Sequence, residues 1–118
     1  MNIRSIFKQM TPRTCLLCGA DALHRPLCPG CLDDLPWHTP AHCPQCATPT
    51  PDGQVCGACL KRPPAFDRSV AALAYAFPLD RLIPRLKYNG RLAIAPALGD
   101  CLAQVVASRP QPDRLIAM

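Results

Sequence analysis

The sequence lacks any long uninterrupted apolar run. Its most apolar stretch, residues 92–106, is broken by Pro96, Gly99 and Asp100, whereas a membrane-spanning helix needs about 20 consecutive, predominantly apolar residues. We therefore expect no membrane insertion. The sequence also contains no Glu, so that all of its acidic residues are Asp, but this scarcity indicates no particular function.

An export signal is also missing from the first thirteen residues. They contain Arg4, Lys8 and Arg13, without a continuous apolar core or a small-residue cleavage site. Disulfide-rich frameworks belong to secreted proteins and other oxidising environments. We therefore expect a cytoplasmic protein whose cysteines are reduced.

The first half of the chain has too few apolar residues to build a core. Residues 1–64 hold ten of the fifteen prolines, and proline-rich segments form turns rather than regular elements. Binding of a structural zinc ion contributes on the order of 10 kcal/mol of folding free energy near neutral pH. We expect bound zinc to supply most of the stability of this region, and its metal-free form to be disordered.

Eight of the nine cysteines form four C-x2-C pairs, and the second two pairs repeat the first two at an offset of 28 residues. Each C-x2-C turn presents two thiolates, and two such turns complete the four-sulfur tetrahedron that zinc prefers. The sequence thus predicts two structural zinc ions and a tandemly duplicated ribbon. The predicted ligands are Cys15, Cys18, Cys28, Cys31, Cys43, Cys46, Cys56 and Cys59.

A disulfide framework would also use eight cysteines, but the missing export signal disfavours it. The wiring of the zinc sites is a separate question, because a cross-brace would interleave the pairs, whereas sequential ribbons would use the first four cysteines and then the last four. Tandem duplication favours the sequential arrangement.

Net charge depends strongly on the metal. The formal charge of +5 treats cysteines as neutral, and two zinc ions bound by eight thiolates lower it to +1. Residues 1–64 change from +2 to −2 on binding both ions, which makes the ribbons poor non-specific binders of polyanions. The positive charge lies in residues 65–118, and its densest cluster is Arg81, Arg85, Lys87 and Arg91.

The second half of the sequence alternates strand-like and helix-like patterns. Residues 69–77 form an apolar run that predicts a buried strand, although the run is rich in alanine. Pro78 is expected to begin a helix whose apolar face comprises Leu79, Leu82, Ile83 and Leu86, and Asn89-Gly90 to end it. Pro84 conflicts with an uninterrupted helix, so the helix is expected to start late or to kink.

A second helix is expected to begin near Pro96, and residues 114–118 resemble the start of another buried strand. Asp100 and Gln104 are expected to face outward. The apolar face of this helix would bury Leu98, Cys101, Leu102, Val105 and Val106.

The predicted fold class is therefore a small zinc-stabilised tandem ribbon, residues 1–64, followed by the beginning of an α/β domain, residues 65–118, that is cut short. A parallel sheet needs more strands than this to cover both faces. We infer that the sequence is the N-terminal part of something longer, or that it completes its fold with a partner.

This order of elements resembles the ComF (GntX-type) family of bacterial proteins, from about Cys15 to the end of the chain. The most specific part is Leu82-Ile83-x-x-Leu86-Lys87-Tyr88-x-Gly90, which follows two four-cysteine ribbons and a Phe66-Asp67 joint. The resemblance implies a double zinc ribbon followed by a type I phosphoribosyltransferase-like domain. It also implies a role in competence and DNA uptake, or in the use of DNA as a nutrient.

The sequence departs from the phosphoribosyltransferase pattern at the substrate site. Those enzymes bind phosphoribosyl pyrophosphate with two adjacent acidic residues and a Thr- and Gly-rich loop, and the only adjacent acidic pair here, Asp33-Asp34, lacks the loop. We expect that pair to be solvated surface. No catalytic or cofactor-binding residue is assigned, and phosphoribosyl pyrophosphate would be a ligand only if a downstream domain exists.

The other notable residues have ordinary structural explanations. Cys101 is expected to be a small buried hydrophobe, Trp37 to pack between the ribbons, and the basic cluster to be a solvated face. Base stacking by Trp37 and nucleic-acid docking by the cluster are the alternatives. Three histidines are expected to be non-ligands, because four sulfurs complete each site: His24, His38 and His42.

Two functions follow from these observations. In the first, the chain is the zinc-binding N-terminal portion of a ComF-like protein, with structural zinc and no catalysis of its own. In the second, it is a complete adaptor whose ribbons bind a protein or single-stranded nucleic acid, such as components of the DNA-uptake machinery or single-stranded DNA. Binding that weakens steeply with salt and depends on Arg81, Arg85 and Lys87 would favour the second function.

Overall fold

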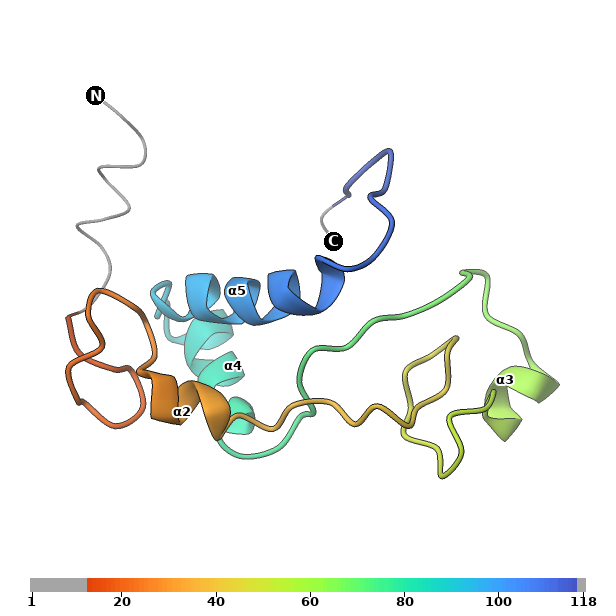
Figure 1. Ribbon diagram of the computed structural model, residues 1–118, viewed down its shortest axis with the longest axis horizontal. Helices are drawn as coiled ribbons and strands as arrows, with labels where there is room; N and C mark the ends of the chain where they lie inside the picture. Colours follow the sequence, from red (N-terminus) through yellow and green to blue (C-terminus); the bar gives the residue numbers. More distant parts are fainter. Residues whose placement is uncertain (1–12, 117–118) are drawn as a thin grey trace.

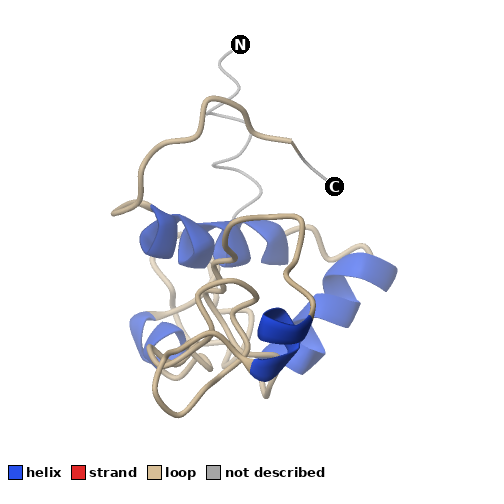
Figure 2. Cartoon of the chain, turned by 90° about the vertical axis from the view of Figure 1, so that its right-hand side faces the viewer, coloured by secondary structure: helices blue, strands red, loops and turns tan. Residues whose placement is uncertain are grey.

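The computed structural model describes residues 13–116, which form four helices joined by long loops. The helices are α2 (Pro29–Asp33), α3 (Gly57–Lys61), α4 (Leu79–Tyr88) and α5 (Ile94–Val106). Figure 2 shows no strand in this described range, where the extended pairing consists of isolated bridges. None of these helices is long and apolar enough to cross a bilayer.

The backbone repeats itself with the same offset as the cysteines. The antiparallel bridge Thr14↔Asp21 recurs as His42↔Pro49. The hydrogen bond from the Cys15 N–H to the Ala20 carbonyl, 2.7 Å, recurs from Cys43 to Thr48 at 2.8 Å. The duplicated ribbon predicted from the sequence is therefore present in the three-dimensional structure.

The short helices α2 and α3 are the matching ends of the two ribbons. Cys28 and Cys56 are their N-cap residues, and both have the extended backbone that an N-cap requires. The Cys28 Sγ accepts a hydrogen bond from the Cys31 N–H at 3.5 Å, and Pro29 occupies the first helical position, where no donor is needed. Each short helix thereby carries the last cysteine of its ribbon.

The first ribbon and α5 share one apolar core. Its buried members are Cys15, Ala22, Leu27, Leu35, Ala97 and Cys101. Leu16, Leu17 and Leu32 are partly buried and pack against it. In Figure 1 the first ribbon and α2 lie beside α4 and α5 at one end of the molecule. The first ribbon is thus part of the helical body.

The second ribbon lies at the other end of the long axis, around α3 (Figure 1). It buries its own Cys43, Ala47 and Cys59, and none of these belongs to the core that contains α5. Two of the apolar residues that pack the first ribbon onto the core are replaced here, because Leu16 and Leu17 correspond to Pro44 and Gln45. The equivalent of Leu32, Leu60, is still apolar but is exposed. The second ribbon therefore has a less apolar surface at the positions through which the first ribbon docks.

Helix α4 confirms the predicted helix and its boundaries. It spans Leu79–Tyr88 with Pro78 and Asn89 as its caps, and Gly90 follows with a φ of 63°. Leu79 and Leu82 are buried. The helix runs through Pro84 without starting late, although Pro84 has no N–H to donate to the Asp80 carbonyl.

Helix α5 begins two residues before the predicted start and places Pro96 in its first turn, where backbone donors are free in any case. Ile94, Ala97 and Cys101 are buried. The predicted burial of Leu102 and Val106 is wrong, because both side chains are exposed. They lie on the side of the helix that faces a groove rather than the core, and lining residues of this groove include Val70 and Leu115.

The predicted strand at residues 69–77 is also wrong. Leu73 forms a single antiparallel bridge with Trp37, held by hydrogen bonds from the His38 N–H to the Ala72 carbonyl and from the Ala74 N–H to the Pro36 carbonyl. Alanine has low β-propensity, and the run pairs only with the short segment around Trp37 in the part of the chain that the structure describes. The apolar run is therefore a loop with one bridge and is not part of a sheet.

The second predicted strand, residues 114–118, is not formed in its described part, residues 114–116. Leu115 is 90% exposed and Ile116 is also exposed, so nothing covers the apolar side chains that suggested a strand. Residues 117 and 118 lie outside the described range. The α/β domain predicted for residues 65–118 is thus represented here by two packed helices without a sheet.

Candidate metal centres

The eight paired cysteines form two compact clusters of four sulfur atoms. In each cluster all sulfurs lie within 4.8 Å of one another, and the clusters follow the sequential grouping rather than a cross-brace. The Cys18 and Cys28 Sγ atoms are 3.6 Å apart, as are those of Cys46 and Cys56. A tetrahedral zinc site with Zn–S bonds of about 2.3 Å needs sulfurs about 3.8 Å apart, so both clusters fit zinc.

Each cluster is built from a tight turn and a helix start. The Gly19 N–H donates to the Cys15 carbonyl at 3.0 Å, and the Ala47 N–H donates to the Cys43 carbonyl at 2.9 Å. These turns place the first two sulfurs of each ribbon side by side. The other two come from the N-cap and the third residue of α2 or α3, so regular backbone geometry positions all four.

Backbone donors favour the thiolate form at the first cysteine of each ribbon. Burial opposes ionisation of Cys15, but the N–H groups of Cys18 and Cys28 outweigh it and lower the Cys15 pKa to about 6. At the equivalent position, the N–H groups of Cys46 and Cys56 lower the pKa of Cys43 to about 6, and the latter lies 3.3 Å from the Cys43 sulfur. Both ribbons thus prepare one thiolate before metal binds.

At the last cysteine of each ribbon the pKa is raised instead of lowered, which disfavours the thiolate. Hydrogen bonds with the side chains of Cys18 and Cys28 raise the pKa of Cys31 far above its usual range. Burial, followed by the Cys46 side chain, raises the pKa of Cys59 to about 12. Four thiolates cannot accumulate at such short distances without a cation. A divalent metal ion supplies the missing positive charge, which agrees with two structural zinc ions.

Neither His38 nor His42 belongs to a cysteine cluster. The His38 Nε2 lies 2.8 Å from the Ala47 carbonyl oxygen, and the His42 Nδ1 lies 2.8 Å from the Thr39 carbonyl oxygen. Both rings therefore support the loops of the second ribbon. His24 is exposed on the first ribbon and is likewise absent from the clusters.

Cys101, the unpaired ninth cysteine, is fully buried in the core between α5 and the first ribbon. Burial raises the pKa of its thiol above the ordinary value, with a smaller contribution from Asp100. A buried protonated thiol is a poor nucleophile. The structure therefore agrees with the prediction that Cys101 is a small hydrophobic core residue.

Trp37 lies in the segment between the ribbons and is bridged to Leu73. Its indole Nε1–H donates to the Leu32 carbonyl at 3.1 Å, and 37% of its surface is exposed. Asp33 and Asp34 are exposed at the end of α2, as predicted for solvated surface. Trp37 thus links the first ribbon to the segment that precedes α4.

The basic residues predicted as a cluster are exposed on and after α4: Arg81, Arg85, Lys87 and Arg91. Two neighbouring aromatic side chains, Phe77 and Tyr88, are exposed as well. Neither was predicted from the sequence as a site residue. For Tyr88, the helical spacing relative to Arg81 and Arg85 was the signal that could have identified it.

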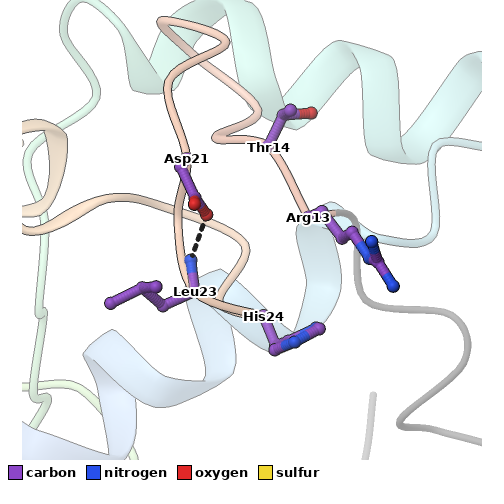
Figure 3. A pocket seen from close by; sticks show the side chains of 5 residues that line it. All are labelled: Arg13, Thr14, Asp21, Leu23 and His24. Atoms are coloured by element: carbon purple, nitrogen blue, oxygen red, sulfur yellow. Dashed lines mark hydrogen bonds between the residues drawn. The ribbon is translucent and has the colours of Figure 1, made fainter.

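A shallow cavity of about 410 Å³ lies on the tip of the first ribbon. It is lined by Arg13, Thr14, Asp21, Leu23 and His24, and Figure 3 shows the Asp21 carboxylate directed at the Leu23 backbone. The Leu23 N–H donates to Asp21 Oδ1 at 2.9 Å, which closes the local turn. One carboxylate and one imidazole are too few ligands for a metal site.

Comparison with known proteins agrees with this geometry. Residues 6–60 match the family described as "Double zinc ribbon domain". The chain is also similar to "DNA utilization protein YhgH" from Escherichia coli strain K12, with 37% identity over 83 residues. The proteins of the same name from Shigella flexneri and Salmonella typhi are 39% and 37% identical over the same length.

These alignments include 64% of the present chain, and the chain spans 37% of the length of these relatives. No solved structure matches the chain. The N-terminal region thus forms a double zinc ribbon with two four-cysteine clusters suited to structural zinc, in a chain that resembles DNA utilization proteins.

Proposed function

We propose that this chain is the zinc-binding N-terminal portion of a ComF-like protein that takes part in the use of DNA, in the cytoplasm, where its thiols stay reduced. The observation that carries the proposal is the pair of four-sulfur clusters in a chain similar to DNA utilization proteins. Zinc in these clusters is structural, because four sulfurs fill every coordination position and leave none for water or substrate. The ligands are the eight cysteines of the two clusters.

Residues 65–118 are proposed to belong to a phosphoribosyltransferase-like domain that residues 1–64 precede. An apolar groove of about 870 Å³ supports this proposal, since lining residues include Val70, Leu102, Val106 and Leu115. Exposed apolar surface of this kind is what further protein structure covers. The much greater length of the relatives is consistent with such additional structure.

No catalytic step is assigned to this chain. The sequence has no adjacent acidic pair followed by the Thr- and Gly-rich phosphate-binding loop of a phosphoribosyltransferase, because Asp33-Asp34 lacks this loop. Phosphoribosyl pyrophosphate would be bound only by a downstream domain.

The proposed role in DNA use is tested by deleting the gene and growing the cells with DNA as the sole carbon source. We expect the deletion strain to stop growing on DNA while it still grows on glucose. The native gene should restore growth, and a gene carrying Cys28→Ser should restore it poorly because the first ribbon is lost. Normal growth of the deletion strain on DNA would overturn the proposal.

A second candidate, a zinc-ribbon adaptor, is favoured by the exposed basic side of α4. Such an adaptor would bind single-stranded nucleic acid or a protein of the DNA-uptake machinery. The two candidates differ in the salt dependence of binding, because phosphate contacts weaken steeply with salt.

A further inference from the structure

We propose that the exposed side of α4 binds single-stranded DNA through a stripe of three residues, here called the α4 stripe: Arg81, Arg85 and Tyr88. In this interaction the two arginines contact phosphates, and the Tyr88 ring stacks on a base. The choice of DNA as the nucleic acid rests on the proposed function, whereas the surface chemistry stands on the structure alone.

The spacing of the stripe follows the turns of the helix. Arg81, Arg85 and Tyr88 are separated by four and three residues, which places them on one side of an α-helix. Phe77 is not part of this side, because it precedes the cap residue Pro78, to which a cis peptide bond joins it.

The opposite side of α4 is fixed to the protein. Leu82 is only 1% exposed and Leu79 is 5% exposed. Leu79 lies almost opposite Arg81 on the helix, and Leu82 lies about a quarter of a turn from it. These buried side chains hold the helix in one orientation. In contrast, Tyr88 is 81% exposed, so its aromatic ring is accessible to a ligand.

The charge around the stripe is strongly positive. Residues 77–91 contain four basic residues and a single acidic one, Asp80. The Arg91 N–H donates to the Arg85 carbonyl at 3.1 Å, so the chain after α4 folds back and adds a third arginine near the stripe. Such a surface complements a phosphodiester backbone, whereas the zinc-loaded ribbons carry net negative charge.

The combination of an exposed ring and neighbouring arginines indicates single strands rather than duplex. Stacking on an aromatic ring requires an unpaired base, and the arginines beside the ring contact the adjoining phosphates. From Arg81 to Tyr88 the stripe extends about 10 Å at 1.5 Å per residue, which is room for a few nucleotides. We therefore infer a short, sequence-tolerant site.

The test uses the zinc-loaded native protein and a fluorescein-labelled oligothymidylate of about 15 nucleotides, with fluorescence anisotropy as the readout. Tyr88→Ala should weaken binding about tenfold or more, because one base–aromatic stack is lost. The double change Arg81→Ala and Arg85→Ala should reduce the slope of log affinity against log salt by about 1.4, or about 0.7 per phosphate contact.

Two matched controls lie elsewhere on the surface. Phe66→Ala removes an exposed aromatic ring and should leave the affinity for the oligonucleotide unchanged. Arg62→Ala removes an exposed arginine after α3 and should leave the salt slope unchanged. A duplex of the same length should bind more weakly than the single strand. Inorganic phosphate at the same phosphate concentration should not displace the oligonucleotide, because it offers no bases to stack.

The proposal is overturned if the native protein does not bind the oligonucleotide, if Tyr88→Ala and Phe66→Ala bind equally, or if duplex binds better than single strand. It is also overturned if Tyr88→Ala lowers the unfolding temperature by several degrees and leaves binding intact, because the ring would then be covered by protein. The growth experiment separates failure of the DNA-binding proposal from failure of the proposed function. If only the DNA-binding proposal is wrong, cells carrying Tyr88→Ala still grow on DNA and deletion cells do not. If the proposed function is wrong, deletion cells also grow on DNA.

Discussion

At the scale of single residues, the two ribbons differ at the turn that follows their second cysteine. Gly19 has a φ of 75° and its counterpart Ala47 a φ of 63°. Both values lie in the left-handed region, which a side chain makes unfavourable by roughly 1–2 kcal/mol. A Cβ added to Gly19 would meet no atom within 4 Å, so backbone conformation alone decides the effect of substitution there.

We expect Gly19→Ala to weaken zinc binding at the first ribbon by about fivefold, because about 1 kcal/mol of backbone strain enters the metal-bound state. The reciprocal change, Ala47→Gly, should strengthen the second ribbon by a similar or smaller factor. Competition with a calibrated zinc chelator measures both affinities. Unchanged affinity in Gly19→Ala would contradict the assigned turn conformation.

Cys101 provides a second test at this scale. Cys101→Ala should leave two zinc ions bound, because the thiol belongs to neither cluster, and should cost about 1 kcal/mol through the small cavity that it creates. Native mass spectrometry gives the zinc count, and thermal unfolding gives the stability. A count below two would make Cys101 a ligand.

At the scale of elements, the first ribbon is coupled to α5 and the second is not. Cys28→Ser and Cys56→Ser form a matched pair, because both positions are helix N-caps and serine is a good N-cap. Each change therefore removes a metal ligand while it preserves the cap.

We expect each variant to lose one zinc ion, but only Cys28→Ser to lose helix content as well. Loss of the first zinc removes on the order of 10 kcal/mol from that ribbon, which is comparable with the whole stability of a small domain, and the core around Leu27 and Leu35 then opens. Far-UV circular dichroism at equal zinc stoichiometry separates the variants. Equal helix loss in both would contradict the coupling.

The sequence predicted these elements unequally. The cysteine spacing was sufficient to predict the two zinc ribbons, and the apolar face of residues 79–88 was sufficient to predict α4. Zinc coordination and helical periodicity depend on residues close together in the sequence. The strand at residues 69–77 was mispredicted, since a strand exists only through its partners, and the described structure supplies a single bridge at Leu73. The sequence likewise could not reveal that Leu102 and Val106 face a groove.

At the scale of the whole molecule, metal binding couples the ribbons to pH. The lowered pKa values of Cys15 and Cys43, about 6, mean that their thiolates stabilise the folded ribbons fully above the unfolded-state pKa. This contribution falls as the pH drops from about 9 toward 6 and is lost below it. Protons and zinc compete for the same sulfurs.

We expect zinc to remain bound at pH 7 and to be released as the pH falls below about 6, with more than one proton taken up per ion. A zinc-responsive dye, read during a pH titration, gives the midpoint and the steepness of release. Release near pH 8, or uptake of a single proton per zinc, would contradict the cooperative four-thiolate site.

The separate position of the second ribbon has an evolutionary consequence. In the first copy, Ala22, Leu27 and Leu35 are constrained by the core, whereas the corresponding positions of the second copy hold Thr50, Val55 and Pro63. Of the two copies, only the first has to keep apolar residues that pack against α5. The surface of the second ribbon can therefore diverge among relatives much faster than that of the first, as long as its four cysteines remain.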